Sequence, residues 1–498
     1  MKKRSLWLSA AAALVAAIVL AGCGTTTYFA GRVLPPSGLQ NRVLIAVQNT
    51  SSSNRGALVF VDAFYDIRNS NNGKVAGFGI SGFSGALPST IQNMPEEQLG
   101  AVYGAGDGSF TLIDYAKESA SGAQKGLNGT SSSVFITRNQ AFTFAASQAS
   151  HVITVLDRTN GGNYALNLPG VYRVSVNPGG SVAFAFVENS NYVYYTRKLT
   201  AAEGIAYSGG ASTWPKAAVD CEPQNAPGWC AFQAQSPDAT DATGNYYGNP
   251  LIFDRPVKAI FSVDGTTAYI LNCGQECGGS TSSVSLLQVS PMIFLSGQHS
   301  GSLPTNETLD ANCSTVANVA SCTLPIPGGA SNAVLSASTM YVAGQQAQPD
   351  GLFSGNVTVV NLTGTASSTA TASSPVSISD GAPGATSRMI LADDSTLWIG
   401  MTKCTNGERY ATGKPYGCLT MFNTSTNSVT MLEPFLGDLT GIAAVTGLHK
   451  VYVAQGGQVY IYHTTDGSSL NNQYVTVTGT ASDVAFMDAH TDANNTVY

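Results

Sequence analysis

Residues 174–186 read VSVNPGGSVAFAF, two apolar runs on either side of Asn-Pro-Gly-Gly. Proline holds φ at about −65° and glycine adopts positive φ readily, so residues 177–180 suit a tight turn. The flanking runs are rich in Val and Phe, which favour strands. Residues 257–271 repeat the pattern around Asp264 and Gly265, and Asp-Gly between β-rich runs is a strong hairpin signal. The sequence therefore predicts paired strands joined by tight turns.

Short β-rich runs of this kind recur along the chain, whereas sustained helical periodicity is almost absent after the first 22 residues. Eight hairpins can be paired, and they have apolar runs at 43–47 with 58–61, 101–103 with 110–113, 142–146 with 152–156, 182–186 with 192–195, 268–271 with 284–287, 340–342 with 357–360, 397–399 with 419–422, and 451–453 with 459–462. The shorter spacings between them match a four-stranded propeller blade of about 40–50 residues. The longer spacings indicate insertions.

Repeated four-stranded units favour radial closure, because a ring of blades leaves only short, protected sheet edges. The first unit lacks an apolar strand before residue 43, and the last unit is followed by a spare apolar run at 484–487. We expect that run to complete the first blade and to hold the ring shut. The predicted fold is all-β, a β-propeller of seven or eight four-stranded blades, and the hairpin count favours eight.

Two segments, KVYVAQGGQVYIY at 450–462 and HVITVLD at 151–157, resemble the repeat of YVTN/lactonase-like β-propellers. The resemblance extends over most of residues 42–487 as a loose repeat pattern. It implies a propeller of seven or a similar number of blades. It transfers no catalytic residue, because these motifs specify the packing of blades and not chemistry.

The N-terminus has the pattern of an export signal. Residues 1–4 read MKKR, residues 6–21 are apolar apart from Ser9, and Leu20-Ala21-Gly22-Cys23 follows. This ending resembles the lipobox of bacterial lipoproteins, which implies cleavage before Cys23 and lipidation of its thiol. We therefore expect a signal peptide at 1–22, a lipidated Cys23 with a tether at 23–41, and one propeller domain at 42–498. Gly24 is not Asp, and by resemblance to enteric lipoproteins this favours anchoring in the outer membrane, facing the periplasm or the surface.

Eight further cysteines fall into four pairs of near neighbours: Cys221 with Cys230, Cys273 with Cys277, Cys313 with Cys322, and Cys404 with Cys418. Disulfide bonds persist in an oxidising compartment, which agrees with export. Eight cysteines allow 105 connectivities, so the local pairing is a hypothesis. A zinc site at Cys273 and Cys277 would need a second Cys or His pair at suitable spacing, and the sequence has none.

The composition gives little support for nucleic-acid binding, and the sequence contains no known catalytic motif. The 498 residues contain 23 Lys and Arg against 30 Asp and Glu, and charged residues make up 11 %, where about 25 % is typical. The chain lacks G-x-S-x-G and a phosphate-binding loop, and its five histidines are not spaced as metal pairs. Asp488, His490 and Asp492 alternate as a weak cation motif, but a solvated polar tail is the better interpretation. We predict no catalytic residue, no metal site and no cofactor.

Two insertions, at about 201–256 and 291–330, are long enough to suggest a function. The first carries the aromatic residues Trp214, Trp229, Tyr246 and Tyr247, which we expect to form a binding platform for a protein or carbohydrate ligand. The main hypothesis is a monomeric, lipid-anchored envelope propeller that binds or scaffolds without catalysis and contacts the membrane through Cys23. The alternative is a lactonase-like hydrolase acting on a sugar lactone in the central funnel, by fold analogy alone. The lactonase hypothesis predicts acidic, His or Arg side chains at the channel mouth; the binding hypothesis predicts an aromatic or amide-rich groove beside the insertions.

Overall fold

The computed structural model describes residues 32–491 apart from 52–54, 67–77, 224–226, 236–238, 241–245, 248, 290–322, 350, 363–370, 380–384, 403–417 and 432–435. The described chain is built almost entirely of antiparallel strands. Its one α-helix, α2 (Ala201–Ala206), begins at Thr200 with a capping box completed by Glu203. No helix in these described ranges has the length and apolarity needed to cross a membrane.

All but two of the described strands form eight sheets, numbered here as blades 1 to 8 and given from the innermost strand outward. Blade 1 is β36 (Thr480–Phe486), β1 (Arg42–Gln48), β2 (Gly56–Asp62) and β3 (Phe78–Gly79); blade 2 is β4 (Pro88–Met94), β5 (Leu99–Gly104), β6 (Ser109–Asp114) and β7 (Ser119–Gly126); blade 3 is β8 (Ser133–Ile136), β9 (Phe142–Ser147), β10 (Val152–Asp157) and β11 (Gly162–Asn167); blade 4 is β12 (Val171–Val176), β13 (Val182–Val187), β14 (Val193–Lys198), β16 (Trp229–Gln233) and β15 (Ala218–Glu222).

The remaining blades follow the same plan. Blade 5 is β19 (Pro256–Phe261), β20 (Thr267–Asn272), β21 (Ser283–Gln288) and β22 (Thr323–Pro325); blade 6 is β23 (Asn332–Ser336), β24 (Thr339–Ala347) and β25 (Phe353–Asn361), with β26 (Thr371–Ala372) and β27 (Val376–Ser379) both paired to β25; blade 7 is β28 (Ala385–Ala392), β29 (Thr396–Thr402), β30 (Leu419–Asn423) and β31 (Ser428–Met431); blade 8 is β32 (Leu439–Val445), β33 (Lys450–Gln455), β34 (Gln458–His463) and β35 (Ser469–Val475).

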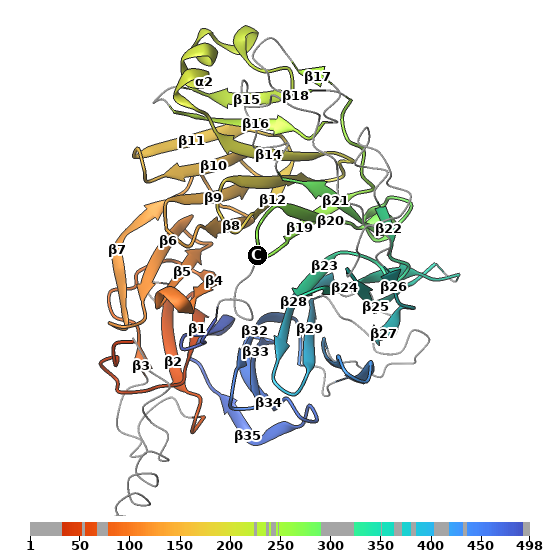
Figure 1. Cartoon of the computed structure of the whole chain (residues 1–498). Coiled ribbons are helices and arrows are strands. Elements are labelled where there is room, and N and C mark those ends of the chain that lie inside the picture. Colours follow the sequence, from red (N-terminus) through yellow and green to blue (C-terminus); the bar gives the residue numbers. More distant parts are fainter. Residues whose placement is uncertain are drawn as a thin grey trace, which may run out of the picture.

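The blades are arranged as an eight-bladed β-propeller, with their innermost strands around a common axis (Figure 1). This confirms the predicted fold and the count of eight. Each predicted hairpin is the second and third strand of one blade, from β1–β2 in blade 1 to β33–β34 in blade 8. A further small hairpin, β17 (Ala239–Thr240) with β18 (Tyr246–Tyr247), lies in the first insertion.

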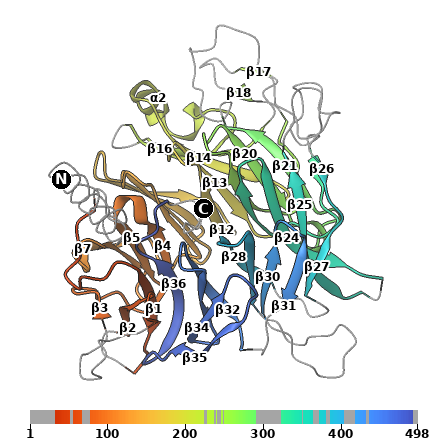
Figure 2. The same cartoon turned by 60° about the horizontal axis from the view of Figure 1, so that its bottom comes forward.

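The ring is closed by the pairing that the sequence predicts. β36, near the end of the chain, is the innermost strand of blade 1 and pairs antiparallel with β1, as Figure 2 shows. The register places Val43 opposite Phe486 and Ile45 opposite Val484. The first sheet is therefore assembled from both ends of the described chain.

Apolar packing occurs between blades. The described core divides into eight large clusters, and each joins two neighbouring blades; the cluster between blades 8 and 1, for example, contains Tyr452 and Phe486. Trp398 of β29 is fully buried between blades 7 and 8. Because every interface has its own cluster, the stability of the ring depends on all eight blades being present together.

Two disulfide bonds are formed as predicted, Cys221–Cys230 and Cys273–Cys277. The first joins β15 to β16, which shows that part of the 201–256 insertion is built into blade 4 as its outer strands. Cys418 is disulfide-bonded, and its predicted partner Cys404 lies outside the described residues. Cys313 and Cys322 also lie outside them, so both of these pairings remain predictions.

The expectation of a solvated tail after the last strand is wrong for Asp488. Its carboxylate is buried and accepts hydrogen bonds from Arg42 Nε at 3.0 Å and Arg42 Nη2 at 2.7 Å. Arg42 Nη1 also contacts Glu118 Oε1 at 2.9 Å. Asp488 thus forms a structural ion pair with Arg42 of β1. The alternation of Asp488, His490 and Asp492 in the sequence could not show this pair, because it depends on the pairing of β36 with β1.

Candidate functional site

Three basic side chains occupy equivalent positions on innermost strands. The pairing register shifts between Val171 and Arg173 in β12, between Pro256 and Lys258 in β19, and between Thr386 and Arg388 in β28. Each shift inserts one extra residue directly before the basic one, and such bulges re-aim the side chains beside them. Blades 4, 5 and 7 therefore each contribute one cation at the same level of their innermost strand.

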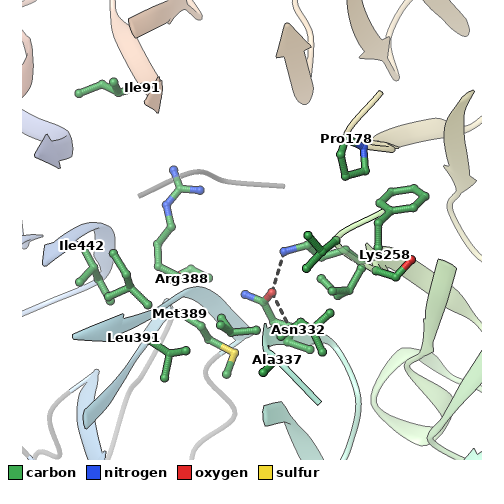
Figure 3. A pocket seen from close by; sticks show the side chains of 18 of the residues that line it. Ile91, Pro178, Lys258, Asn332, Ala337, Arg388, Met389, Leu391 and Ile442 are labelled. Carbon is green, nitrogen blue, oxygen red and sulfur yellow. Dashed lines mark hydrogen bonds between the residues drawn. The ribbon is translucent and has the colours of Figure 1, made fainter. Parts of the chain in front are cut away.

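A cavity of about 360 Å³ lies among the innermost strands of the ring. Its lining includes Lys258 of β19, Asn332 of β23, Arg388 of β28 and Asp483 of β36, together with apolar side chains such as Met389. Figure 3 shows Lys258 and Arg388 extending into the cavity with Asn332 between them. The site thus combines a few polar groups with an apolar wall, as small-molecule sites commonly do.

The cavity extends toward the face of the ring at which the innermost strands end, called here the turn face. Its lining reaches Arg138, Pro178, Val263 and Ala337, which follow the ends of β8, β12, β19 and β23. Val263 is 87 % exposed. The cavity therefore reaches the turn face.

Lys258 has no acidic partner among the described residues. Its Nζ donates to Asn332 Oδ1 at 2.8 Å, and Asn332 Oδ1 also accepts from its neighbour Ala333 N at 3.0 Å. Enclosure by protein, together with repulsion from Arg173 and Arg388, lowers the pKa of Lys258 to about 7. The side chain is half-buried because part of its surface faces the cavity.

Arg388 is held in place by two neighbouring blades. Its Nε donates to Thr440 O at 3.1 Å in blade 8, and its Nη2 donates to Asp483 Oδ2 at 3.2 Å in blade 1. Asp483 is buried and also accepts from Ile91 N at 2.8 Å and Val484 N at 2.9 Å. Burial raises the pKa of Asp483 although Arg388 and these amides favour its charged form. Within the described part of the chain, Arg388 Nη1 donates no hydrogen bond.

The charges at this level do not balance. Among the described residues, Asp483 is the one carboxylate that opposes Arg173, Lys258 and Arg388, and Arg388 is the one of these three cations with which it forms an ion pair. Arg173 is held by its own hydrogen bond, from Nη1 to Val257 O at 3.2 Å. The excess positive charge is placed to attract an anion of small size. Within the described ranges no three His, Cys, Asp or Glu side chains are grouped as a metal site.

The aromatic residues predicted as a binding platform have different environments. Trp229 is fully buried between blades 3 and 4, packs edge-to-face on Phe142 and Phe144, and donates from Nε1 to Asp157 Oδ2 at 3.1 Å. This is the environment of a core residue. Trp214 is half-buried against the cluster between blades 4 and 5. Tyr246 and Tyr247 form β18. A binding role for these four residues is untested and remains a prediction.

Sequence reasoning missed Lys258, Asn332, Arg388 and Asp483. One signal could have found two of them: in each of blades 4, 5 and 7 a lone basic residue stands in an apolar innermost strand, six residues before a turn residue. In a chain with only 11 % charged residues, three such coincidences indicate a shared site. The lactonase hypothesis predicted acidic, His or Arg side chains at the channel mouth; the structure places Arg388 beside Asp483 in the cavity wall, and this pair does not decide between the two hypotheses.

Comparisons with known proteins identify no family. No family model matches the chain, and no curated protein matches its sequence. Similar solved structures include a dihydro-heme d1 dehydrogenase in complex with its ligand (TM-score 0.49, 10 % identity, covering 90 % of this chain and 75 % of that one). Another is the periplasmic gluconolactonase of Pseudomonas aeruginosa (TM-score 0.43, 14 % identity, covering 90 % of this chain and 98 % of that one). A third is a candidate 6-phosphogluconolactonase of Bacteroides fragilis (TM-score 0.44, 10 % identity, covering 91 % of this chain and 99 % of that one). At these identities the likeness concerns the fold alone.

Proposed function

We propose that this protein is a lipid-anchored propeller of the bacterial cell envelope that binds a small organic anion in its central cavity without converting it. The observation that carries the proposal is the unbalanced charge around that cavity, where Lys258 and Arg388 share the described part of the wall with one carboxylate, that of Asp483, which is paired with Arg388. An enclosed ammonium without a counter-ion is unfavourable, because burial disfavours the charged form. A carboxylate from outside would supply the missing counter-charge.

The geometry also favours a ligand with a planar acidic group. Arg388 is fixed through Thr440 O and Asp483, so its remaining Nη1 has a defined position. Guanidinium groups bind carboxylates through directional, charge-assisted hydrogen bonds. A volume of about 360 Å³ lies at the lower end of the range for small-molecule sites, about 300–1,000 Å³. The expected ligand is therefore of metabolite size, with apolar carbon facing Met389 and its neighbours.

The anchor is proposed on the lipobox pattern that ends at Cys23. Arg32, nine residues later, donates from Nη2 to Pro95 O at 3.1 Å and to Ala489 O at 2.6 Å. Both acceptors follow the ends of innermost strands, so this part of the chain lies on the turn face. Nine residues span at most about 32 Å. An anchor at Cys23 would therefore keep the turn face, and the cavity that opens there, close to the lipid.

Calorimetric titration of the purified chain with succinate, gluconate and sulfate tests the binding proposal. Loss of a charged hydrogen bond costs about 1.5–3 kcal/mol, so Lys258→Met and Arg388→Met are each expected to weaken binding roughly tenfold to a hundredfold. Lys117→Met and Arg158→Met, which remove exposed cations, serve as matched controls and should bind normally. Equal affinity in all five proteins, or no binding to any of them, would contradict the proposal.

The anchor and the lactonase alternative are tested separately. Intact-mass analysis of the membrane fraction should show cleavage before Cys23 and added acyl chains, and Cys23→Ser should release the protein; an unmodified membrane form would contradict the anchor. The pair of Arg388 and Asp483 in the channel is the observation that favours the alternative. Hydrolysis of gluconolactone that disappears in Asp483→Asn would establish the alternative, whereas we expect no turnover above the uncatalysed rate.

A further inference from the structure

The environment of Lys258 suits a reactive amine as well as a cation that pairs with a bound anion. It stands in the cavity wall, and its one hydrogen bond within the described chain goes to a neutral amide, that of Asn332. The charged groups that act on it are Arg173 and Arg388, both positive. A lysine that is enclosed and placed beside other cations loses its proton easily and becomes nucleophilic.

A reaction at Lys258 also requires a group that positions the reactant, and Arg388 can do this by binding the reactant's carboxylate. Its Nε and Nη2 are bound to blades 8 and 1, and its guanidinium group extends into the same cavity as Lys258 (Figure 3). A ligand whose carboxylate binds Arg388 would lie with its adjoining carbon atoms in the space that Lys258 also faces. Holding the two groups in one small cavity converts an encounter in solution into a local reaction.

We propose that Lys258 captures carbonyl compounds that carry a carboxylate, the 2-oxo acids, as an imine within the central cavity. This inference rests on the proposed function, because it assigns a ligand class to the same anion site. The neutral amine nitrogen attacks the carbonyl carbon, and the C=O π electrons move to oxygen. The nitrogen then loses its two hydrogens with that oxygen as one molecule of water, leaving a C=N bond. The step is reversible and needs no oxidant or reductant.

The proposal is specific to Lys258 and not to lysines in general. Lys117 is the natural comparison, because its side chain is 75 % exposed and its Nζ pairs with Asp114 Oδ2 at 2.7 Å. An amine with a pKa of about 7 has roughly a thousandfold larger neutral fraction at pH 7 than an ordinary lysine with a pKa of about 10.4. A less basic amine is also a weaker nucleophile, which offsets part of the gain that Lys258 has from its larger neutral fraction. A preference of at least about tenfold for Lys258 is therefore expected.

Reductive trapping tests the proposal on the unmodified chain. The protein is incubated with pyruvate and sodium borohydride at several pH values, and peptide mass spectrometry measures the reduced adduct at Lys258 and at Lys117. We expect the adduct at Lys258 in at least tenfold excess at pH 7, rising with pH through about 7, reduced by succinate, and reduced about tenfold in Arg388→Met. Ethyl pyruvate, which lacks a free carboxylate, serves as the matched reagent and should label Lys258 at least about tenfold less than pyruvate does.

The outcomes separate this inference from the proposed function. If succinate binds in the titration but pyruvate labels Lys258 no more than Lys117, the imine proposal is wrong and anion binding stands. If succinate does not bind and Lys258 is not labelled, both proposals fail. If ethyl pyruvate labels Lys258 as strongly as pyruvate does, the amine is reactive but the 2-oxo acid class is wrong. Labelling of the wild-type chain requires no variant, so a folding defect in Arg388→Met does not affect this comparison.

Discussion

Arg42 in β1 shows how much one residue contributes to closure of the ring. Its side chain is 4 % exposed and contacts Asp488, which follows β36, and Glu118, which follows β6. Removing one member of a buried ion pair leaves an uncompensated charge and costs about 3–5 kcal/mol. We expect Arg42→Met to lower the free energy of unfolding by about that amount in urea titrations. Lys117→Met breaks an exposed pair and should change stability by less than about 1 kcal/mol; equal effects would refute this account of Arg42.

Lys258 gives the proposed anion site a definite pH dependence. Its pKa in the free protein is lowered to about 7, and a bound anion stabilises the protonated form, so the pKa rises on binding. Affinity for sulfate, which keeps its charge across this range, should be constant below pH 7 and fall by up to about tenfold per pH unit above it. Calorimetry between pH 6 and pH 9 measures this directly. Lys258→Met should bind weakly at every pH, and an unchanged slope in that variant would assign the titration to another group.

At the scale of elements, the Cys221–Cys230 bond holds β15 to β16 at the outer edge of blade 4. A disulfide that closes a loop of this length stabilises by about 2–4 kcal/mol. Replacing both cysteines with serine should lower the free energy of unfolding by that amount, again in urea titrations. The two residues are buried at 6 % and 0 % exposure, so Cys→Ala at both positions controls for the polarity of serine. If both double variants are as stable as the parent chain, the bond is not a stabilising element.

The elements also show what the sequence can and cannot predict. The second and third strands of every blade were predictable because each contains a short apolar run, such as VYVA in β33 and VYIY in β34. The outermost strands were not, since β7 reads SASGAQKG and has no apolar pattern. The bulges were not predictable either, because they depend on the register with the neighbouring strand. Lys258 and Arg388 can be recognised as one site only when the arrangement of blades 5 and 7 in the ring and the bulge in each innermost strand are known. Sequence reasoning therefore found the fold and missed the site.

At the scale of the whole molecule, the ring depends on β36. Burial of Val484, Phe486 and Met487 contributes roughly 5–9 kcal/mol, against a total stability of about 5–15 kcal/mol for a typical protein. A chain that ends before Thr480 also loses Asp483 and Asp488, and it is expected to lose cooperative unfolding and to aggregate. A chain that ends at Thr491 retains β36 and both carboxylates and should unfold as the full chain does. Circular dichroism and size-exclusion chromatography distinguish these outcomes; a monodisperse, cooperatively folded short chain would show that β36 is dispensable.

The central claim is that the closed ring of eight blades creates one anion site from residues far apart in the sequence. A crystal structure grown with selenate tests it most directly, because the anomalous signal of selenium locates the anion independently of the protein coordinates. The claim predicts eight blades closed by β36 and β1, with selenate in the central cavity at hydrogen-bond distance from Lys258 Nζ and Arg388 Nη1. An ordered selenate elsewhere with the cavity left to solvent, or a ring in which β36 does not pair with β1, would contradict it.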